Sequence, residues 1–510
     1  MGLDGATFDV LDGLADLGAM PELARMRRGC GRAVLRSTIP MYTLPSWTTL
    51  WTGLPPAEHG VLYWREGGPP VPWRVEEGGF TYLPSGRIPM LWDIAEAAGR
   101  KVGCIDIPLA FPASPAGELF TSGFMAPAGS PRMVSPPDLL DAFPTWVPEV
   151  QKSLTSSELR RRPDEAAAYV AALSAQTELR RQLLGEIGDD IDFLCIVNVV
   201  PDRLSHLDFD RLLAMAATGE AGDELTRCWQ DVDALLGDAL SWAGDDGTVL
   251  VVSDHGFARG PAFNVATWLS KAGLDGVVNQ RALGLQRLAG RLLPARVGDA
   301  IRPVLRRRLG VGDELPISAG HRSPELWPIS LDDRACYLYL RPDIKAARGD
   351  AVVRQVLDAA LGRSSIPTGV APFAECLSQA EAFDREDPGL PDVVLLPADD
   401  WILRTDHGDP RLSWPDGGSE HHRDGVLLAR GPSVIAGAHE PADMGDMFAT
   451  VLATLELPQP GGTSGTSVAW VHRPVTGQAV PTAPRPVADG VTPEEAVDLE
   501  AHLRSLGYLD

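Results

Sequence analysis

The sequence predicts an α/β fold, in which a doubly wound, mostly parallel sheet is flanked by helices and interrupted by inserted cap segments. A helix pattern over 89–99 is followed directly by a strand pattern over 101–108, which is typical of a βαβ unit. Two later runs, 191–200 and 248–253, are almost continuously apolar, as are strands that are buried on both faces of a parallel sheet. Asp202 follows the first run after one proline and Asp254 directly follows the second, and ligand sites in such sheets lie at the carboxyl ends of the strands. We therefore expect a polar site along one edge of the sheet.

The composition is that of a globular protein. Its 510 residues are 44% apolar, which is sufficient for two or three domains or for one large α/β domain with insertions. The net charge of −24 disfavours binding to nucleic-acid polymers and to anionic membranes. The six cysteines are scattered, as reduced thiols usually are, and neither a membrane span nor a secretion signal is recognisable. These features predict a cytoplasmic protein and leave its oligomeric state open.

Residues 1–130 are expected to form the first part of the core. The opening residues resemble the end of a buried strand that runs into a turn, with so little strand before it that the sequence leaves open whether Met1 is the true start. A short helix over 21–28 and a strand over 32–38 lead into the stretch 43–60. That stretch has the pattern of a turn that presents one hydroxyl, followed by a helix and a second turn rich in proline and glycine.

Two long segments interrupt the core pattern. Residues 131–190 are polar and punctuated by proline, then strongly helical over 164–187, which predicts a helical cap. Residues 264–390 form a second insertion, within which 281–308 carries eight arginines against one aspartate. We interpret this basic segment as a solvated amphipathic helix; the alternative is an electropositive lid that attracts an anionic substrate.

The core is expected to resume over 191–263 and again over 391–472, and residues 473–510 are expected to form a proline-rich connector and a C-terminal helix. That helix begins with a capping box at Thr492. Besides the two buried runs, the helices and strands expected in the resumed core lie at 224–243, 392–397, 426–429 and 444–455.

Three carboxylates follow strands or strand ends, namely Asp4, Asp202 and Asp254. The carboxyl ends of neighbouring parallel strands meet at one edge of the sheet, so these side chains are expected to converge. Without compensating cations they would repel one another strongly.

Three imidazoles accompany these carboxylates. His206 follows Asp202 by four residues, His255 follows Asp254 directly, and His421 lies in the polar turn 416–425. Six oxygen and nitrogen ligands are too many for one tetrahedral ion but suit two divalent ions. Two such ions, about 3.5–4 Å apart, can activate a hydroxyl and clamp the attacking and leaving oxygens of an in-line phosphoryl displacement.

A family resemblance rests on six motifs that occur in the family's order. They are Asp4-Gly-Ala-Thr-Phe-Asp, Thr43-Leu-Pro-Ser-Trp-Thr-Thr-Leu-Trp-Thr-Gly, Pro55-x-x-x-His59-Gly, Asp202-x-x-x-His206, Ser253-Asp-His-Gly-Phe and His421-x-x-Asp-Gly. Together they resemble the type I phosphodiesterase/nucleotide pyrophosphatase family of the alkaline phosphatase superfamily. The resemblance implies an alkaline phosphatase-like core that holds two divalent ions, usually zinc, with manganese as the alternative.

The resemblance also implies roles for individual residues. By matching position, one ion would be bound by Asp202, His206 and His421, and the other by Asp4, Asp254, His255 and Thr43. Thr43 would be the nucleophile that attacks phosphorus and forms a covalent phosphothreonine or its ester, and a second displacement by water would give net retention at phosphorus.

Several residues near these motifs leave a choice. Thr43 competes with other hydroxyls of its helix, and its place just before the Leu-Pro turn favours it. Of the adjacent His421 and His422, we expect one to face the site, and we favour His421 because it stands four residues before Gly425. We interpret His59 as a residue that stabilises its turn. The tryptophans of this region could stack on a nucleobase, but core packing is the more common role of such residues.

Two features depart from the family pattern. In the nucleotide pyrophosphatases, an asparagine five positions beyond the histidine of the His-Gly turn helps to hold a phosphoryl oxygen, and Trp64 stands at that position here. Arg65 is the candidate for the missing positive partner, so Trp64 and Arg65 are the predicted substrate-binding residues. The short first strand would leave the backbone that carries Asp4 poorly anchored if Met1 were the true start.

We therefore predict a metal-dependent hydrolase that cleaves phosphodiester or nucleotide pyrophosphate-type bonds in a small anionic substrate. A phosphonate hydrolase or a phosphomonoesterase on the same core is the alternative among enzymes. A non-catalytic binding module that retains the fold is the alternative of a different class. The identity of the substrate stays open, because specificity would lie in the two insertions.

Overall fold

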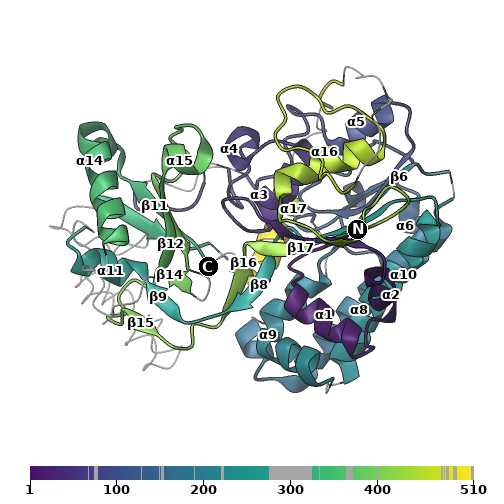
Figure 1. Cartoon of the computed structure of the whole chain (residues 1–510), viewed down its shortest axis with the longest axis horizontal. Coiled ribbons are helices and arrows are strands. Elements are labelled where there is room, and N and C mark those ends of the chain that lie inside the picture. The colour runs from purple at the N-terminus through teal and green to yellow at the C-terminus, as the bar shows by residue number, and fades with distance from the viewer. Residues whose placement is uncertain are drawn as a thin grey trace. The chain divides into compact units, whose positions relative to one another are not determined.

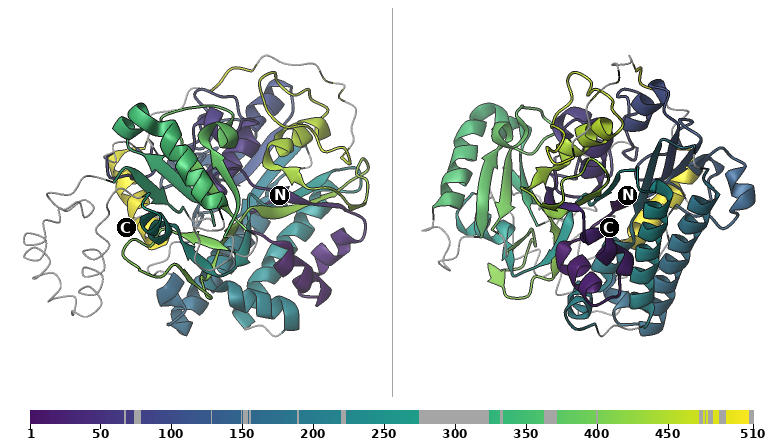
Figure 2. Two further views of the ribbon diagram at one scale, coloured as in Figure 1. Left: turned by 60° about the vertical axis from the view of Figure 1, so that its left-hand side comes forward. Right: turned by 45° about the vertical axis from the view of Figure 1, so that its right-hand side comes forward.

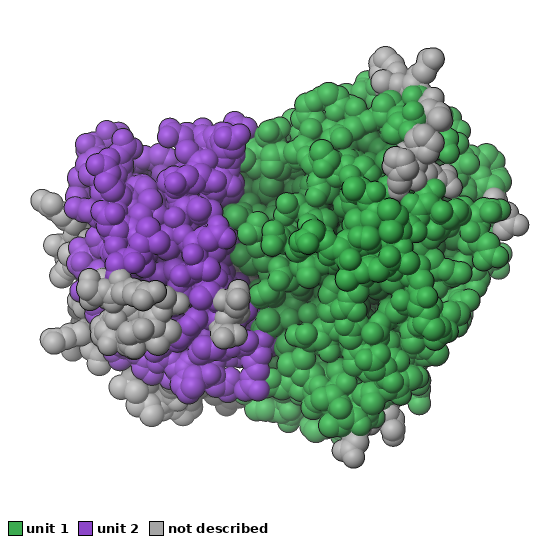
Figure 3. All heavy atoms as spheres, viewed as in Figure 1, with its two compact units in different colours: residues 1–66, 79–258, 421–510 green, residues 67–78, 259–420 purple. Residues whose placement is uncertain are grey.

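The computed structural model divides the chain into two compact units, which Figure 3 distinguishes by colour. Unit 1 comprises residues 1–66, 79–258 and 421–510, and unit 2 comprises 67–78 and 259–420. The basic segment 281–308 lies outside the described residues. The structure describes residues 1–66, 68–73, 79–127, 129–148, 150, 154, 156–188, 190–219, 223–274, 324–331, 334–362, 372–398, 401–471, 475, 477, 482–485 and 491–506.

Unit 1 is built on a ten-stranded sheet with the order β18-β2-β17-β7-β1-β6-β3-β4-β5, in which β19 also pairs with β2. The neighbours from β7 to β4 are all parallel, whereas β17 is antiparallel to both of its neighbours and β5 is antiparallel to β4. The predicted mostly parallel sheet is confirmed. The strands are β1 (Gly2–Leu3), β2 (Gly31–Arg36), β3 (Val102–Ile107), β4 (Leu119–Ser122), β5 (Val134–Ser135), β6 (Phe193–Asn198), β7 (Val249–Val252), β17 (Asp424–Arg430), β18 (Gly437–Ala438) and β19 (Ala442–Asp443).

Helices cover both faces of this sheet (Figures 1 and 2). One layer contains α1 (Phe8–Asp16), α2 (Pro21–Arg27), α8 (Pro163–Glu186), α9 (Val200–Thr218) and α10 (Asp223–Ala243). The opposite layer contains α3 (Thr43–Thr52), α5 (Leu91–Ala97) and α16 (Met444–Thr454). The shorter or peripheral helices of the unit are α4 (Pro56–His59), η1 (Pro131–Met133), α6 (Leu139–Ala142), α7 (Ser156–Leu159) and α17 (Pro493–Leu506).

The helix expected over 164–187 is α8, and it packs along α10 in the first helical layer. Residues 131–190 also supply β5, which extends the edge of the main sheet. This segment is therefore part of the body of unit 1. The capping box predicted at Thr492 is present at α17, because the Thr492 amide donates to Glu495 and the Glu495 amide donates to the Thr492 hydroxyl.

The first strand, β1, is only two residues long but occupies the middle of the sheet between β6 and β7. The amide of Asp4 donates to the carbonyl of Asn198 at 3.0 Å, and the amide of Val252 donates to the carbonyl of Met1 at 3.0 Å. Hydrogen bonds on both sides therefore anchor the backbone that leads to Asp4, contrary to the expectation from its short length.

Unit 2 has a four-stranded antiparallel sheet of order β10-β11-β13-β12. The strand expected over 392–397 is β13, and it lies in this sheet, so the chain returns to unit 1 at residue 421 and not at 391. An apolar run predicts a strand but not the sheet it joins. The elements of this sheet and its helices are β10 (Leu326–Ile329), β11 (Cys336–Leu340), β12 (Phe373–Ser378), β13 (Val393–Pro397), α11 (Val265–Lys271), α14 (Pro342–Leu361) and α15 (Gln379–Phe383).

Two smaller sheets complete the topology. One has the order β14 (Ile402–Arg404), β9 (Ala262–Asn264) and β15 (Ser413–Trp414), and the other pairs β8 (Gly256–Arg259) with β16 (Ser419–His422). All six cysteines are free thiols. In the part of the chain that the structure describes, no helix combines the length and the apolar character needed to cross a membrane.

Candidate metal centre and nucleophile

Three buried carboxylates meet at the carboxyl edge of the main sheet in unit 1. Asp4 follows β1, Asp202 lies in the first turn of α9 just after β6, and Asp254 follows β7. They converge because β7, β1 and β6 are adjacent parallel strands, so that their carboxyl ends lie side by side. The exposed fraction of each residue is 2% or less.

Gly5 allows these three carboxylates to approach one another. Its φ of +64° is a conformation that other residues adopt only with strain, and an added Cβ would lie 2.8 Å from the Cβ of Asp202. Its amide donates a 3.2 Å hydrogen bond to Oδ1 of Asp254. The glycine thus lets the turn after β1 pass between the other two aspartates.

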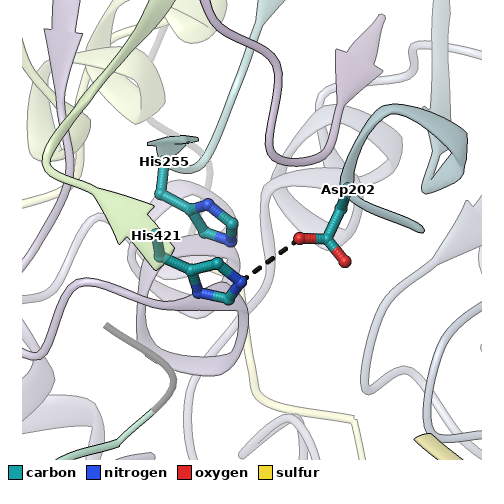
Figure 4. A group of neighbouring side chains, drawn as sticks. All are labelled: Asp202, His255 and His421. Atoms are coloured by element: carbon teal, nitrogen blue, oxygen red, sulfur yellow. Dashed lines mark ion pairs between the residues drawn. The ribbon is translucent and has the colours of Figure 1, made fainter. Parts of the chain in front are cut away.

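The first group of potential metal ligands consists of Asp202, His206 and His421. The Nε2 atoms of the two histidines are 2.9 Å apart, and Oδ1 of Asp202 lies 3.2 Å from Nε2 of His421 and 3.4 Å from Nε2 of His206. Figure 4 shows Asp202 facing His421, with the ion pair drawn as a dashed line. The three side chains therefore point toward one small volume.

The second group consists of Asp4, Asp254 and His255, whose ligand atoms lie within 4.8 Å of one another. Nε2 of His255 is 3.3 Å from Oδ2 of Asp254 and 3.7 Å from Oδ1 of Asp4. The ring of His255 also stacks on that of His421 (Figure 4), and the ring centroids are 3.8 Å apart. His255 therefore borders both groups.

The donor set fits divalent cations. Oδ1 of Asp202 and Oδ2 of Asp254 are buried, and neither accepts a hydrogen bond from any residue that the structure describes. Buried carboxylate oxygens are costly unless they are hydrogen-bonded, paired or bound to a metal. Carboxylate oxygen and imidazole nitrogen are ligands that zinc and manganese both accept. Two such groups, bordered by one shared histidine, fit two ions.

The two buried imidazoles at the centre of the site are neutral at neutral pH. Burial lowers the pKa of His255 to about 3, and the neighbouring His421 contributes to this shift. Burial likewise lowers the pKa of His421 to about 4. Each ring therefore has an unprotonated nitrogen with a lone pair, which is the form that binds metals.

The pKa values of Asp254 and Asp202 shift in opposite directions. Burial, together with the charge of Asp4, raises the pKa of Asp254 well above its ordinary value. Burial would also raise the pKa of Asp202, but the neighbouring His206, His421 and Arg203 together outweigh it and hold this pKa well below its ordinary value. After burial, the largest cause of the raised pKa of Asp254 is repulsion by the carboxylate of Asp4, and a cation would relieve this repulsion.

Thr43 is the first residue of α3, and its hydroxyl faces the ligand groups. Its Oγ1 lies 3.3 Å from Nε2 of His255, and the residue is 3% exposed. The helix begins after Tyr42, whose backbone is extended. The hydroxyl of Tyr42 donates to the carbonyl of Leu62 at 2.5 Å. The start of α3 thus presents one hydroxyl to the site.

The other hydroxyls of this helix are engaged elsewhere. The hydroxyl of Ser46 pairs with that of Ser37, the hydroxyl of Thr48 donates to the Leu44 carbonyl, and the hydroxyl of Thr49 pairs with Nε2 of His59. Nδ1 of His59 accepts the amide of Val61, so this histidine joins the second turn to α3 as expected.

Trp47 stands one helical turn after Thr43, on the same face of α3, and contacts the second ligand group. Its Nε1 donates a 2.8 Å hydrogen bond to Oδ2 of Asp4. Trp47 and Trp51 are buried and stacked, in agreement with the core interpretation of these aromatics. The bond to Asp4 was not predicted, although the four-residue spacing from Thr43 placed Trp47 on the correct face.

Replacing Trp47 by phenylalanine is expected to weaken the binding of one metal ion by ~10- to 100-fold, because the hydrogen bond that orients Asp4 is lost while an aromatic ring remains. The affinity can be measured by competition with a chelator. Trp51→Phe is the matched control, since Nε1 of Trp51 is buried and donates to no described residue. Equal metal affinities of the two variants would contradict the orienting role.

His421 reaches the site because β16 pairs with β8, which begins directly after His255. Successive side chains of a strand point to opposite faces. His421 is accordingly 1% exposed and faces Asp202, whereas Nδ1 of His422 accepts the amide of Asp424.

The two predicted substrate-binding residues, Trp64 and Arg65, contact other side chains of the protein. Trp64 is 4% exposed, and its ring packs against Tyr42 and edge-on against Phe124. The guanidinium of Arg65 lies over the ring of Phe80, and its Nη2 is 3.6 Å from Oε2 of Glu500. The burial of Trp64 does not favour a direct contact with substrate.

Arg203 is a charged neighbour of the site that was not predicted. Its Nη1 donates a 2.6 Å hydrogen bond to Oδ2 of Asp202, and its guanidinium lies 4.9 Å from the ring centroid of Phe124. The sequence gives no distinct signal for this contact, because an arginine directly after an aspartate is also common on the solvated face of a helix.

Comparison with known proteins identifies a family. The sequence model described as type I phosphodiesterase/nucleotide pyrophosphatase matches residues 1–424. No protein with a curated description matches the chain.

Similar solved structures include phosphonoacetate hydrolase from Sinorhizobium meliloti 1021 in complex with phosphonoacetate (16% identity, TM-score 0.49, covering 88% of this chain and 92% of that chain). They also include an inactive murine ectonucleotide pyrophosphatase/phosphodiesterase 5 in complex with AMP (15% identity, TM-score 0.45, covering 91% of this chain and 96% of that chain). The human ectonucleotide pyrophosphatase/phosphodiesterase 5 is a third (11% identity, TM-score 0.47, covering 92% of this chain and 97% of that chain).

Proposed function

Because this chain belongs to the type I phosphodiesterase/nucleotide pyrophosphatase family, we propose that it is a metal-dependent hydrolase of phosphodiester or nucleotide pyrophosphate-type bonds. The observation that carries the proposal is the position of Thr43. Its hydroxyl lies 3.3 Å from His255, the residue that borders both groups of ligand side chains.

The ligand side chains divide between two ions. Asp202, His206 and His421 would hold one ion, and Asp4, Asp254, His255 and the Thr43 hydroxyl would hold the other. When bound, two divalent cations, zinc or manganese, supply positive charge. This charge favours ionisation of the Thr43 hydroxyl and stabilises the negative charge that develops on the phosphoryl group.

Thr43 acts as the nucleophile toward a small anionic phosphoester. The bond from its Oγ1 to phosphorus forms as the bond from phosphorus to the leaving-group oxygen breaks. Thr43 gives up its hydroxyl proton and the leaving-group oxygen takes one up, so that an alcohol or a phosphate is released. A diester substrate leaves an ester of phosphothreonine, because its second ester group stays on phosphorus. Water then attacks phosphorus and displaces Thr43, whose oxygen regains a proton. The two in-line displacements give net retention at phosphorus. The amino end of α3 adds a favourable dipole for an anionic group at this position.

The same groups would also attack a phosphonate or a phosphomonoester, so the substrate class is decided by comparison. We propose to test bis-p-nitrophenyl phosphate, p-nitrophenyl phosphate, a nucleotide ester and a phosphonate in parallel. Highest kcat/KM with the two diester-type compounds is the expected result. A preference for the phosphonate or the monoester would identify the alternative enzyme, and inactivity on all four with two metals bound would favour a binding module.

Removal of the metal ions is expected to abolish hydrolysis and to lower the temperature of unfolding, because buried carboxylates then repel one another without compensation. An ion at one hundred times its Kd contributes ~2.7 kcal/mol to stability. Activity and unfolding temperature are measured after chelation and dialysis, then after addition of Zn²⁺ or Mn²⁺. Full activity in protein shown by elemental analysis to contain no metal would contradict the proposal.

A further inference from the structure

We propose that Arg203 is a positioning residue, whose guanidinium holds the carboxylate of Asp202 so that only Oδ1 faces the imidazole ligands. The inference rests on the proposed metal-dependent function and adds to it a residue that lies outside the ligand set. It assigns Asp202 one oxygen for the metal and one for Arg203.

The contact between the two side chains is short and buried. Nη1 of Arg203 donates to Oδ2 of Asp202 at 2.6 Å, and their side chains are 4% and 1% exposed. Hydrogen bonds between ions are stronger than neutral ones, and burial protects this pair from screening by water. Rotation of the Asp202 carboxylate would break this bond.

The other oxygen of Asp202 has a different environment. Oδ1 lies 3.2 Å from Nε2 of His421 and 3.4 Å from Nε2 of His206, and it accepts no hydrogen bond from the described residues. The two oxygens of one carboxylate are therefore divided between a guanidinium and the imidazole ligands. Such a division favours binding of a metal through one oxygen.

Arg203 is itself held from outside its own helix. Its guanidinium lies 4.9 Å from the ring centroid of Phe124, in the turn after β4, and the carbonyl of Phe124 accepts the amide of Leu109. The ring of Trp64 in turn packs edge-on against Phe124, with the two ring centroids 5.8 Å apart. A planar guanidinium over an aromatic ring has few alternative orientations, so it can impose one on Asp202.

A competing role for Arg203 is charge balance alone, and the two roles predict opposite effects. If its charge mainly repels the bound ions, its removal should tighten metal binding. If it mainly orients Asp202, its removal should weaken binding at one of the two ions. Groups that orient a metal ligand through a hydrogen bond typically change metal affinity by ~10- to 100-fold when they are removed.

The experiment compares Arg203→Met and Arg203→Lys with the wild type in the whole chain, after metal removal and titration with Co²⁺ or Zn²⁺. Arg203→Met keeps an apolar chain against Phe124 but removes the donor. We expect one ion to bind ~10- to 100-fold more weakly, with a changed visible absorption spectrum of Co²⁺ at that site. Arg203→Lys keeps the charge without the planar fork, so we expect a smaller loss, of several-fold.

Arg180→Met is the matched control. Arg180 is also buried, lies over the ring of Trp146 and pairs with the carboxylate of Asp106, which is not a ligand side chain. We expect this control to lower the unfolding temperature without changing the metal affinity or the Co²⁺ spectrum of the folded protein. A general effect of losing a buried arginine is thereby separated from an effect on Asp202.

Wild-type affinity and spectrum in both Arg203 variants would overturn the inference, and so would tighter binding by Arg203→Met. If Arg203→Met does not fold, the affinity and spectrum of Arg203→Lys decide by the same criteria. A wild type that binds no metal contradicts the proposed function itself. A wild type that binds two ions, with both variants unaffected, contradicts only the role of Arg203.

Discussion

Replacement of Thr43 by alanine is expected to lower kcat/KM for bis-p-nitrophenyl phosphate by at least about 10³-fold, because the group that bonds to phosphorus is removed. Six ligand side chains remain, so elemental analysis should still find two ions per chain. Oγ1 of Thr43 lies 3.3 Å from Nε2 of His255, and the hydroxyls of Ser46, Thr48 and Thr49 are engaged in other hydrogen bonds and cannot take its place. The residual rate should therefore be small.

Thr48→Ala is the matched control for this prediction. Thr48 lies in the same helix and is buried, but its hydroxyl donates to the carbonyl of Leu44 at 2.7 Å and does not face the ligand groups. We expect this variant to retain kcat/KM within a few-fold of the wild type. Comparable losses in both variants would indicate damage to α3 as a whole, and activity of Thr43→Ala close to wild type would exclude Thr43 as the nucleophile.

Replacement of Asp254 by asparagine is expected to have two opposite effects. It should reduce bound metal from two ions to one and lower kcat/KM on the order of 10³-fold, since a bound cation contributes several kcal/mol to a charged transition state. It should also raise the unfolding temperature of the metal-free protein. Asparagine has the same shape and can still accept the amide of Gly5, but it removes one of three converging negative charges.

The sign of the stability effect follows from the pKa of Asp254. Burial and the charge of Asp4 raise this pKa well above its ordinary value, so the folded metal-free protein binds the proton more tightly than the unfolded chain does. Its stability therefore falls as the pH rises above the ordinary pKa of an aspartate, and at neutral pH the ionised group is destabilising. The gain from Asp254→Asn should accordingly be present at pH 7 and shrink on acidification.

Asp233→Asn is the matched control. Asp233 is also buried with a raised pKa, but its two oxygens accept the amides of Glu22 and Leu23 at the start of α2. Its replacement loses one of these bonds and should lower stability by about 1 kcal/mol without loss of metal. Differential scanning calorimetry and elemental analysis distinguish the variants. A metal-free Asp254→Asn protein that unfolds at a lower temperature than wild type would contradict the repulsion between these carboxylates.

Local patterns in the sequence predicted most of the elements that carry the site. The apolar run 191–200 is β6, and the run 248–253 is β7. The rule that parallel strands share a carboxyl edge then placed Asp4, Asp202 and Asp254 together, as the structure has them. These predictions succeed because a strand that is buried on both faces of a parallel sheet has an almost continuous run of apolar residues, which is visible in the local sequence.

Sequence reasoning failed where the answer depended on partners far apart in the chain. The strand β13 was predicted as a strand but joins the sheet of unit 2, and the two-residue β1 pairs with Val197 of β6 and Val252 of β7, which lie far along the chain. The packing of Trp64 against Phe124 likewise depends on a distant segment, whereas its predicted contact with substrate stays a prediction. No local pattern encodes which distant segment completes such a contact.

The sequence by itself determined the α/β class, the positions of most helices and strands, and the kinds of ligand at the sheet edge, because these depend on residues close together in the chain. Only the tertiary structure decided which atoms meet. It brought the ring of His421 onto that of His255, the indole of Trp47 to Asp4 and the guanidinium of Arg203 to Asp202. These contacts arise from the simultaneous packing of many segments, and a single hydrogen bond between distant residues leaves no period in the sequence.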